Sequence, residues 1–215
     1  MLHRARVLKN RATFKGSGNF WEENYVQGCT SGDGSYGHLA EFKAKVLNGF
    51  VAEHQLQSFV ELGCGDGNQL SLANYPSYLG YDVSPTALEL CRKRFANDPT
   101  KRFELAPSTK IGSSQAQVAI SLDVIYHLVE DKVFELYMTN LFTLAEEFVI
   151  VYSSDHNNNP RLHHPFILHR EFTPWVAKNA PEWRQSEKIG NDYPFEGDSA
   201  TGSHSDFYVY ERRAQ

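Results

Sequence analysis

An apolar segment that runs directly into closely spaced glycines limits the folds open to this chain more than any other feature. Residues 58–62 read SFVEL and are followed at once by GCGDG at 63–67. The apolar run predicts a strand, and the glycines let the backbone turn sharply and approach a ligand without a side-chain clash. A helix that begins after such a turn offers unpaired N–H groups to a ligand. We therefore expect a strand, a turn and a short helix, with a binding site at the turn.

Strand patterns alternate with helical patterns along the chain. Ser84 followed by Pro85 marks one helix start, because Ser caps free N–H groups and Pro fits the first helical position. Such alternation predicts an α/β fold, a Rossmann-like doubly wound, mostly parallel sheet with ligands at the carboxyl ends of its strands. We expect residues 206–212 to add a C-terminal antiparallel edge strand. The other expected strands are 58–62, 77–82, 102–105, 116–122, 147–154 and 183–189, and helices are expected at 38–54, from 84, at about 130–146 and at 173–179.

Charge and composition argue against several classes of protein. The net charge of −5 argues against a large nucleic-acid interface, because phosphate contacts need clustered Lys and Arg. No apolar run reaches the roughly 20 residues of a membrane span, and no apolar segment of a secretory signal follows the basic N-terminus. Three scattered cysteines fit a reducing compartment, so we expect a cytoplasmic protein. Residues 1–15 are basic and are expected to form a solvated arm, with phosphate contact as the alternative.

Three details at the glycine turn narrow the class of ligand. Asn68 stands where the dinucleotide fingerprint has its third glycine, so that fingerprint is not met. Glu61 and Asp66 place two carboxylates beside the turn, which would repel a pyrophosphate and attract a ligand with an ammonium and a sulfonium. Asp82 ends the next strand, 19 positions after Gly63, where a carboxylate can accept both hydroxyls of a ribose.

Two of these segments carry a resemblance to a known family. ELGCGDGNQL at 61–70 and YLGYDVSPTALELCRKRF at 78–95 resemble the first two motifs of class I S-adenosylmethionine-dependent methyltransferases, and the likeness extends more weakly over about 58–152. The resemblance implies that the turn holds the methionine part of S-adenosylmethionine, that Asp82 binds the ribose and that Val83 packs on the adenine. It implies these cofactor-binding residues: Glu61, Gly63, Cys64, Gly65, Gly67, Asp82, Val83, Ser121, Leu122 and Asp123, the last three bordering the methyl-transfer cleft.

One position departs from the family pattern. Many members carry an acid after the third strand that binds the adenine amino group. This chain has ELAPS at 104–108, so Glu104 is misplaced, and Ala106 and Ser108 are poor substitutes. The sequence therefore names no side chain for the adenine contact.

Candidates for the chemistry lie after the fourth and fifth strands. Methyl transfer from a sulfonium is an in-line displacement in which the protein mainly supplies alignment, and a hydroxyl acceptor benefits from a general base. His127, five residues after Leu122, is the first candidate, with a surface or capping histidine as the structural alternative. Asp155 and His156 are the next candidates, although a polar loop would look the same. Four histidines between 156 and 169 lack the spacing of a metal site, so we expect no bound metal.

The chain is expected to divide into an N-terminal arm and possible lid at 1–37 and a methyltransferase domain at 38–215. Tyr25 and Tyr36 beside the glycine-rich stretch 28–37 fit a lid that excludes water, and Tyr126 is expected to line the acceptor pocket. We expect O-methylation of a small-molecule or carbohydrate acceptor, in line with a resemblance to methyltransferases of sugar and surface-glycan pathways. An RNA or protein methyltransferase, a nicotinamide oxidoreductase and a non-catalytic nucleotide-binding module remain as alternatives.

Overall fold

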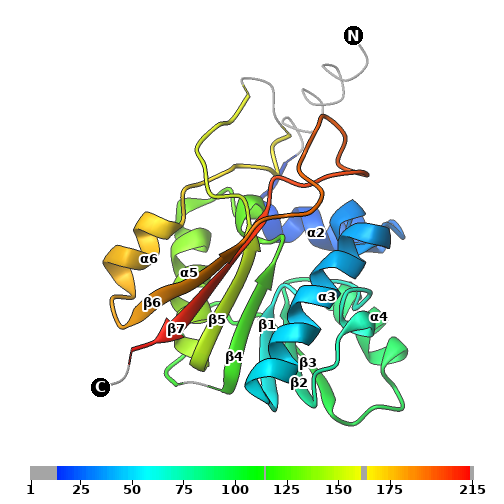
Figure 1. The fold of residues 1–215 in the computed structure, drawn as a ribbon. Coiled ribbons are helices and arrows are strands. Elements are labelled where there is room, and N and C mark those ends of the chain that lie inside the picture. Colours follow the sequence, from blue (N-terminus) through cyan, green and yellow to red (C-terminus); the bar gives the residue numbers. More distant parts are fainter. Residues whose placement is uncertain (1–13, 114, 161–163, 214–215) are drawn as a thin grey trace.

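The computed structural model describes residues 14–113, 115–160 and 164–213, and these form one seven-stranded sheet with helices on both faces (Figure 1). The strand order is β3-β2-β1-β4-β5-β7-β6. The first five strands are parallel, whereas β7 runs antiparallel to both β5 and β6. The strands are β1 (Ser58–Leu62), β2 (Ser77–Asp82), β3 (Lys101–Leu105), β4 (Ala116–Leu122), β5 (Ala145–Ser153), β6 (Trp183–Ile189) and β7 (Asp206–Arg212).

This order confirms the expected Rossmann-like, mostly parallel fold, with one correction at the C-terminal end. Residues 206–212 form an interior strand, and β6 is the edge. The reason lies in the side chains: residues 207–210 of β7 are buried, whereas all but the ends of β6 are exposed. A strand that is covered on both faces is stable only between neighbours, while the charged β6 tolerates an edge.

Two apolar cores pack against the two faces of the sheet. One contains side chains of α5 (Asp131–Leu144) and α6 (Thr173–Asn179), and the other contains side chains of α3 (Gly37–His54) and α4 (Pro85–Arg94). Ser84 caps α4 as expected, since its Oγ accepts a 3.0 Å hydrogen bond from the N–H of Ala87. The short helix expected after the glycine turn is a single 3₁₀ turn, η2 (Leu70–Leu72).

A helix that the sequence analysis did not predict lies over the carboxyl edge of the sheet. Part of the segment 1–37, expected as an N-terminal arm and possible lid, forms α2 (Ser17–Val26), followed by the 3₁₀ turn η1 (Asp33–Ser35). Ser17 Oγ donates to the carbonyl of His127 at 2.7 Å, and Ser17 N donates to Glu130 Oε1 at 2.8 Å. The basic residues 4–11 lie outside the described residues, so the expectation of a solvated arm is not tested there.

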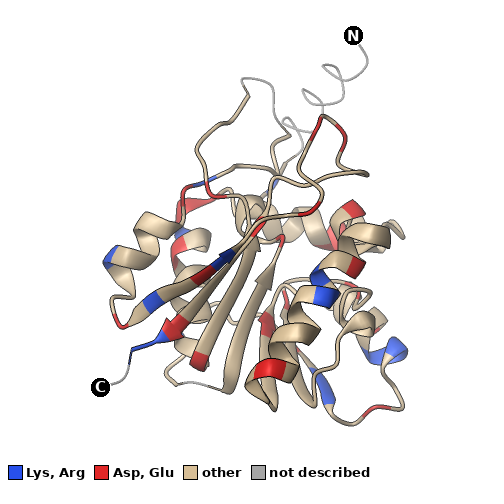
Figure 2. Ribbon diagram, viewed as in Figure 1, with Lys and Arg blue, Asp and Glu red and all other residues tan. Residues whose placement is uncertain are grey.

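The distribution of charge agrees with the low net charge. Figure 2 shows Lys and Arg interspersed with Asp and Glu over the helices and the C-terminal strands, with no continuous basic stripe among the described residues. None of the helices in the described part of the chain is long and apolar enough to cross a membrane.

Candidate functional site

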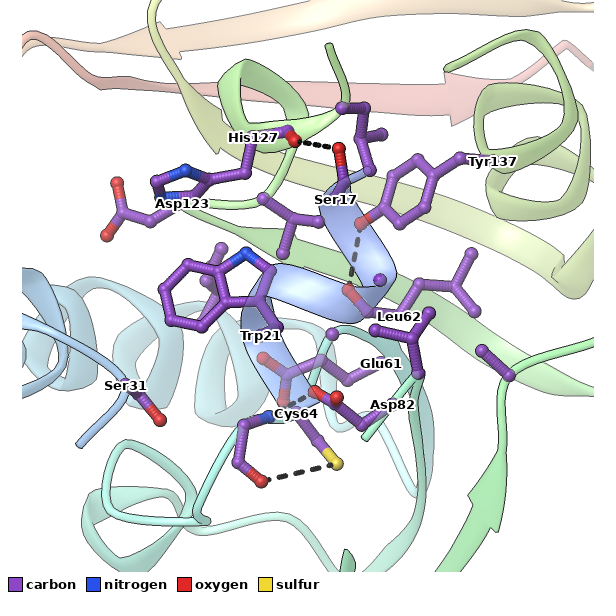
Figure 3. A pocket seen from close by; sticks show the side chains of 18 of the residues that line it. Ser17, Trp21, Ser31, Glu61, Leu62, Cys64, Asp82, Asp123, His127 and Tyr137 are labelled. Carbon is purple, nitrogen blue, oxygen red and sulfur yellow. Dashed lines mark hydrogen bonds between the residues drawn. The ribbon is translucent and has the colours of Figure 1, made fainter. Parts of the chain in front are cut away.

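A cavity of about 170 Å³ lies where the carboxyl ends of β1, β2 and β4 meet, beneath α2 (Figure 3). Parallel strands bring their carboxyl ends to one edge, and the chain changes direction across the sheet between β1 and β4, which is where ligands bind in such folds. The cavity is lined by residues 61–66 at the turn, Asp82 and Val83, Ala106 and Pro107, residues 122–124, His127 and Leu128 after β4, and side chains from α2, α3 and α5.

The glycine turn adopts a backbone that other residues rarely reach. Gly63 and Gly65 have φ angles of 87° and 57°. A Cβ on Gly63 would lie 2.5 Å from Val124, and one on Gly65 would clash with Ser31. The turn is therefore closed to larger side chains, and its backbone faces the cavity directly.

Asp82 is held by the turn that it faces. Its two oxygens accept hydrogen bonds from the N–H of Gly65 and the N–H of Ser84, both at 2.9 Å. Burial raises the pKa of Asp82 to about 6, and the bonds from Ser84 and Gly65 limit the rise. These contacts fix the orientation of a carboxylate whose oxygens each keep a lone pair for a hydroxyl.

Glu61 is the second buried carboxylate of the cavity. The hydroxyl of Tyr78 donates to it at 2.6 Å. Burial raises the pKa of Glu61 to about 7, against the opposing effects of the Tyr78 hydrogen bond and the positive charge of Lys43. A cation in the cavity would favour its ionised form.

Asp123 connects three segments that are distant in the sequence. It is one of two described non-glycine residues with a positive φ, at 59°, a conformation that is uncommon outside glycine. Lys43 of α3 forms an ion pair with it at 2.7 Å, Ser205 donates to it at 2.9 Å and Tyr126 at 3.1 Å. Lys43 is fully buried, so this pair sets the position of the chain after β4.

His127 lies at the opposite end of the cavity from Asp82. Its Nδ1 is 2.8 Å from the carbonyl oxygen of Phe166. Because a carbonyl only accepts, Nδ1 carries the proton and Nε2 presents a lone pair. Burial lowers the pKa of His127, which favours the neutral ring. Trp21 of α2 packs edge-on against His127 at 4.9 Å and lies, in Figure 3, between the Glu61–Asp82 end and the Asp123–His127 end.

Several residues expected at the site lie beside the cavity lining instead. Gly67 belongs to the turn without lining the cavity, and Ser121 bonds to the hydroxyl of Tyr137, which does line it, at 2.7 Å. The hydroxyl of Tyr36 donates to Asp66 at 2.8 Å. Tyr126 is directed toward Asp123. Expected residues that do line the cavity are Tyr25, Glu61, Gly63, Cys64, Gly65, Asp82, Val83, Leu122, Asp123 and His127.

Asp155 and His156 do not line this cavity. Asp155 caps α6: it accepts from the backbone N–H of Phe172 at 2.7 Å and from the Thr173 hydroxyl at 2.7 Å. The ring of His156 packs against those of His169 and His204, at 4.6 and 5.6 Å. Within the ranges that the structure describes, no three His, Cys, Asp or Glu side chains are arranged to hold a metal ion.

The sequence analysis assigned no role in the site to Ser17, Lys43 or Tyr137, all of which line the cavity. Lys43 had a usable signal, since it stands at helical spacing between Leu39 and Leu47, both buried, where a lysine needs a buried partner. Ser17 had none, because α2 lacks an apolar stripe and is held by contacts with distant segments.

Comparison with known proteins relates this chain to a family of enzymes. Residues 60–140 match the model of a family described as a methyltransferase domain. Residues 60–140 therefore belong to an S-adenosylmethionine-dependent methyltransferase domain. Comparison with curated proteins gives no match.

Solved structures of other methyltransferases share the fold. The methyltransferase domain of a bacterial protein, CtHen1-C, is 21% identical with a TM-score of 0.63, covering 81% of this chain and 98% of that one. Magnesium protoporphyrin IX methyltransferase from Synechocystis PCC 6803, solved with bound SAM, is 14% identical with a TM-score of 0.66, covering 94% and 99%. The N-methyltransferase NodS from Bradyrhizobium japonicum WM9, in complex with S-adenosyl-L-homocysteine, is 12% identical with a TM-score of 0.61, covering 80% and 85%.

The residues of the cavity in this methyltransferase domain suit S-adenosylmethionine. The turn that excludes any Cβ leaves space for a ligand, the oriented Asp82 can accept hydroxyls, and two buried carboxylates favour a cation. The related structures carry different activities in their names, so the shared fold leaves the acceptor open.

Proposed function

We propose that this methyltransferase domain methylates a hydroxyl group of a small-molecule or carbohydrate acceptor, with His127 as the general base. The observation that carries the proposal is the contact between His127 Nδ1 and the Phe166 carbonyl, which leaves Nε2 as a proton acceptor in a ring that burial keeps neutral. His127 lines the same cavity as the glycine turn. A hydroxyl acceptor benefits from a base of this kind, whereas an acceptor that is already a good nucleophile does not need one.

The proposed placement of the cofactor follows the chemistry of the lining. Its methionine part lies at the turn formed by Gly63, Cys64 and Gly65, its ribose hydroxyls bond to Asp82, and its base packs against Val83. The bound cofactor supplies an electrophilic methyl group on a sulfonium. His127 takes the proton from the acceptor hydroxyl, and Trp21 separates the cavity from bulk water.

We further propose that residues 1–37 act as a lid on the domain at 38–215. Support comes from α2, which lies over the cavity and contributes Ser17, Trp21 and Tyr25 to its lining. The hydroxyls of Tyr25 and Ser31 are 2.9 Å apart, and Ser31 Oγ accepts from the N–H of Asp66 in the turn at 2.9 Å.

The substitution His127→Asn tests the base. It keeps a polar side chain and removes the titrating nitrogen, so kcat should fall by roughly 10²–10⁴-fold while the Kd for S-adenosylhomocysteine stays unchanged. In the wild type, kcat should rise with pH through a pKa below 6.5, since only the neutral ring accepts a proton. Methyl-label transfer to a panel of sugars and small alcohols first identifies the acceptor, and calorimetry measures the Kd.

His54→Asn provides the matched control, because His54 is exposed on α3 away from the cavity. A loss of kcat below tenfold in His127→Asn, or an equal loss of cofactor affinity, would assign His127 a structural role.

A further inference from the structure

The end of the cavity beyond Asp82 is built from apolar side chains. Val83 follows β2, Ala106 and Pro107 follow β3, and Val133 and Leu136 extend from α5. In the proposed placement, which this inference depends on, the base of the cofactor lies among these side chains.

The two polar side chains that α5 contributes to the cavity lining, Tyr137 and Asn140, are engaged with the protein. Asn140 is 2% exposed; its Oδ1 accepts from the N–H of Ile111 at 2.9 Å and its Nδ2 donates to the carbonyl of Thr109 at 3.1 Å. These contacts use the two ends of one amide to fasten the loop after β3. The hydroxyl of Tyr137 lies 2.8 Å from the carbonyl of Leu62 and 2.7 Å from Ser121 Oγ.

The first two residues after β3 offer no free backbone N–H to a base. The N–H of Ala106 donates to the carbonyl of Asp82 at 2.8 Å, and Pro107 has no N–H. Val83 and Val133 are 49% and 42% exposed, so this end of the cavity opens to solvent. The polar edge of a purine placed here would meet water, which pairs equally well with an amino group or a carbonyl.

Adenine and hypoxanthine differ at that edge. Adenine has an amino donor at C6 beside an acceptor at N1, whereas hypoxanthine has a carbonyl acceptor at C6 and a donor at N1. A site that distinguishes them needs a fixed partner of matching polarity, because the wrong base leaves a buried polar group unpaired. We propose that the described residues of this methyltransferase domain hold the purine by packing alone, and that the domain binds cofactors with a 6-oxo purine as tightly as those with adenine.

Calorimetry with S-adenosyl-L-homocysteine and S-inosyl-L-homocysteine tests this on the full chain. The two Kd values should agree within fivefold, since one net hydrogen bond corresponds to a factor of about five. Val83→Ser should weaken both ligands by the same factor, roughly threefold to tenfold, because it removes apolar contact without changing the polar edge. Leu90→Ser, an exposed apolar residue on α4 away from the cavity, is the control and should change neither Kd.

A preference for adenine of fivefold or more would overturn the inference, as would a Val83→Ser variant with both affinities unchanged. Asp82→Ala separates these outcomes from failure of the proposed placement. It should weaken S-adenosylhomocysteine by about 10- to 150-fold through the lost charge-assisted bonds to the ribose. If Asp82→Ala binds like the wild type, the cofactor placement itself is wrong.

Discussion

Glu61 lowers the stability of the folded protein at neutral pH because it is buried beside the turn. Its pKa lies near 7 in the folded chain, whereas an exposed Glu titrates near 4.5. Between these values the unfolded chain loses a proton that the folded chain keeps, so the free energy of unfolding falls as pH rises from about 4.5 to about 7. The residue thus lowers the stability of the folded protein at neutral pH, and a cation bound nearby would favour its ionised form.

Glu61→Gln should flatten this dependence. The amide keeps an oxygen for Tyr78 and does not titrate. Between pH 4.5 and 7 the free energy of unfolding of the variant should therefore fall by up to about 3 kcal/mol less than that of the wild type. Urea unfolding at a series of pH values measures this pH dependence, and Glu41→Gln on the exposed face of α3 is the control. A variant whose stability falls as steeply as that of the wild type would show that Glu61 is ionised throughout.

At the scale of elements, α2 is held to the domain through the residues next to Asp82. Glu22 accepts from the hydroxyl of Thr86 at 2.8 Å and also bonds to Ser84, at the N-terminus of α4. Ser84 in turn donates its N–H to Asp82. Ser84 therefore connects α2 to Asp82 and, in the proposed function, links the lid to the residue that binds the ribose.

Glu22→Gln should loosen this attachment. It removes a negative charge from the N-terminus of α4 and weakens two hydrogen bonds, so the dissociation rate of S-adenosylhomocysteine should rise about threefold to tenfold. Stopped-flow dissociation measures the rate, and hydrogen exchange should show faster exchange in residues 17–26. The adjacent and exposed Glu23 supplies the control, Glu23→Gln. Equal rates in the two variants would mean that Glu22 does not hold the lid.

Local signals explain which elements the sequence predicts. Strands β1, β2, β4 and β5 are marked by their own apolar runs, the glycines follow β1 directly and Asp82 ends β2, so the edge of the sheet that carries the cavity can be predicted from the sequence. Helix α2 is not, because its stability comes from Ser17 and Glu22 contacting residues more than 60 positions away. Asp155 illustrates the opposite difficulty: an acid after a strand suits a ligand edge, and only the structure shows it capping α6.

At the scale of the whole molecule, the ion pair between Lys43 and Asp123 joins α3 to the carboxyl end of β4. Ser205 connects the same pair to the C-terminal hairpin.

Lys43→Met removes one charge of a buried pair and leaves Asp123 without its ionic partner, so it should lower the free energy of unfolding by roughly 3–5 kcal/mol. Adding Asp123→Asn should recover part of this loss. Urea unfolding of the two single variants and the double variant measures the coupling, and strictly additive losses would show that the pair is not coupled.

The interior position of β7 bears on how the chain reaches this structure. Strands β1 to β5 lie in the first 153 residues and pair with one another except along the side of β5 that faces β7, so they can assemble while later residues are still being synthesised. Strand β6 emerges next but has no partner until residues 206–212 enter between it and β5. Ser205, which completes the contacts of Asp123, arrives with them. A nascent chain therefore exposes the unpaired backbone N–H and C=O groups of β5 until β7 is made, and Asp123 gains its contact with Ser205 at the same stage.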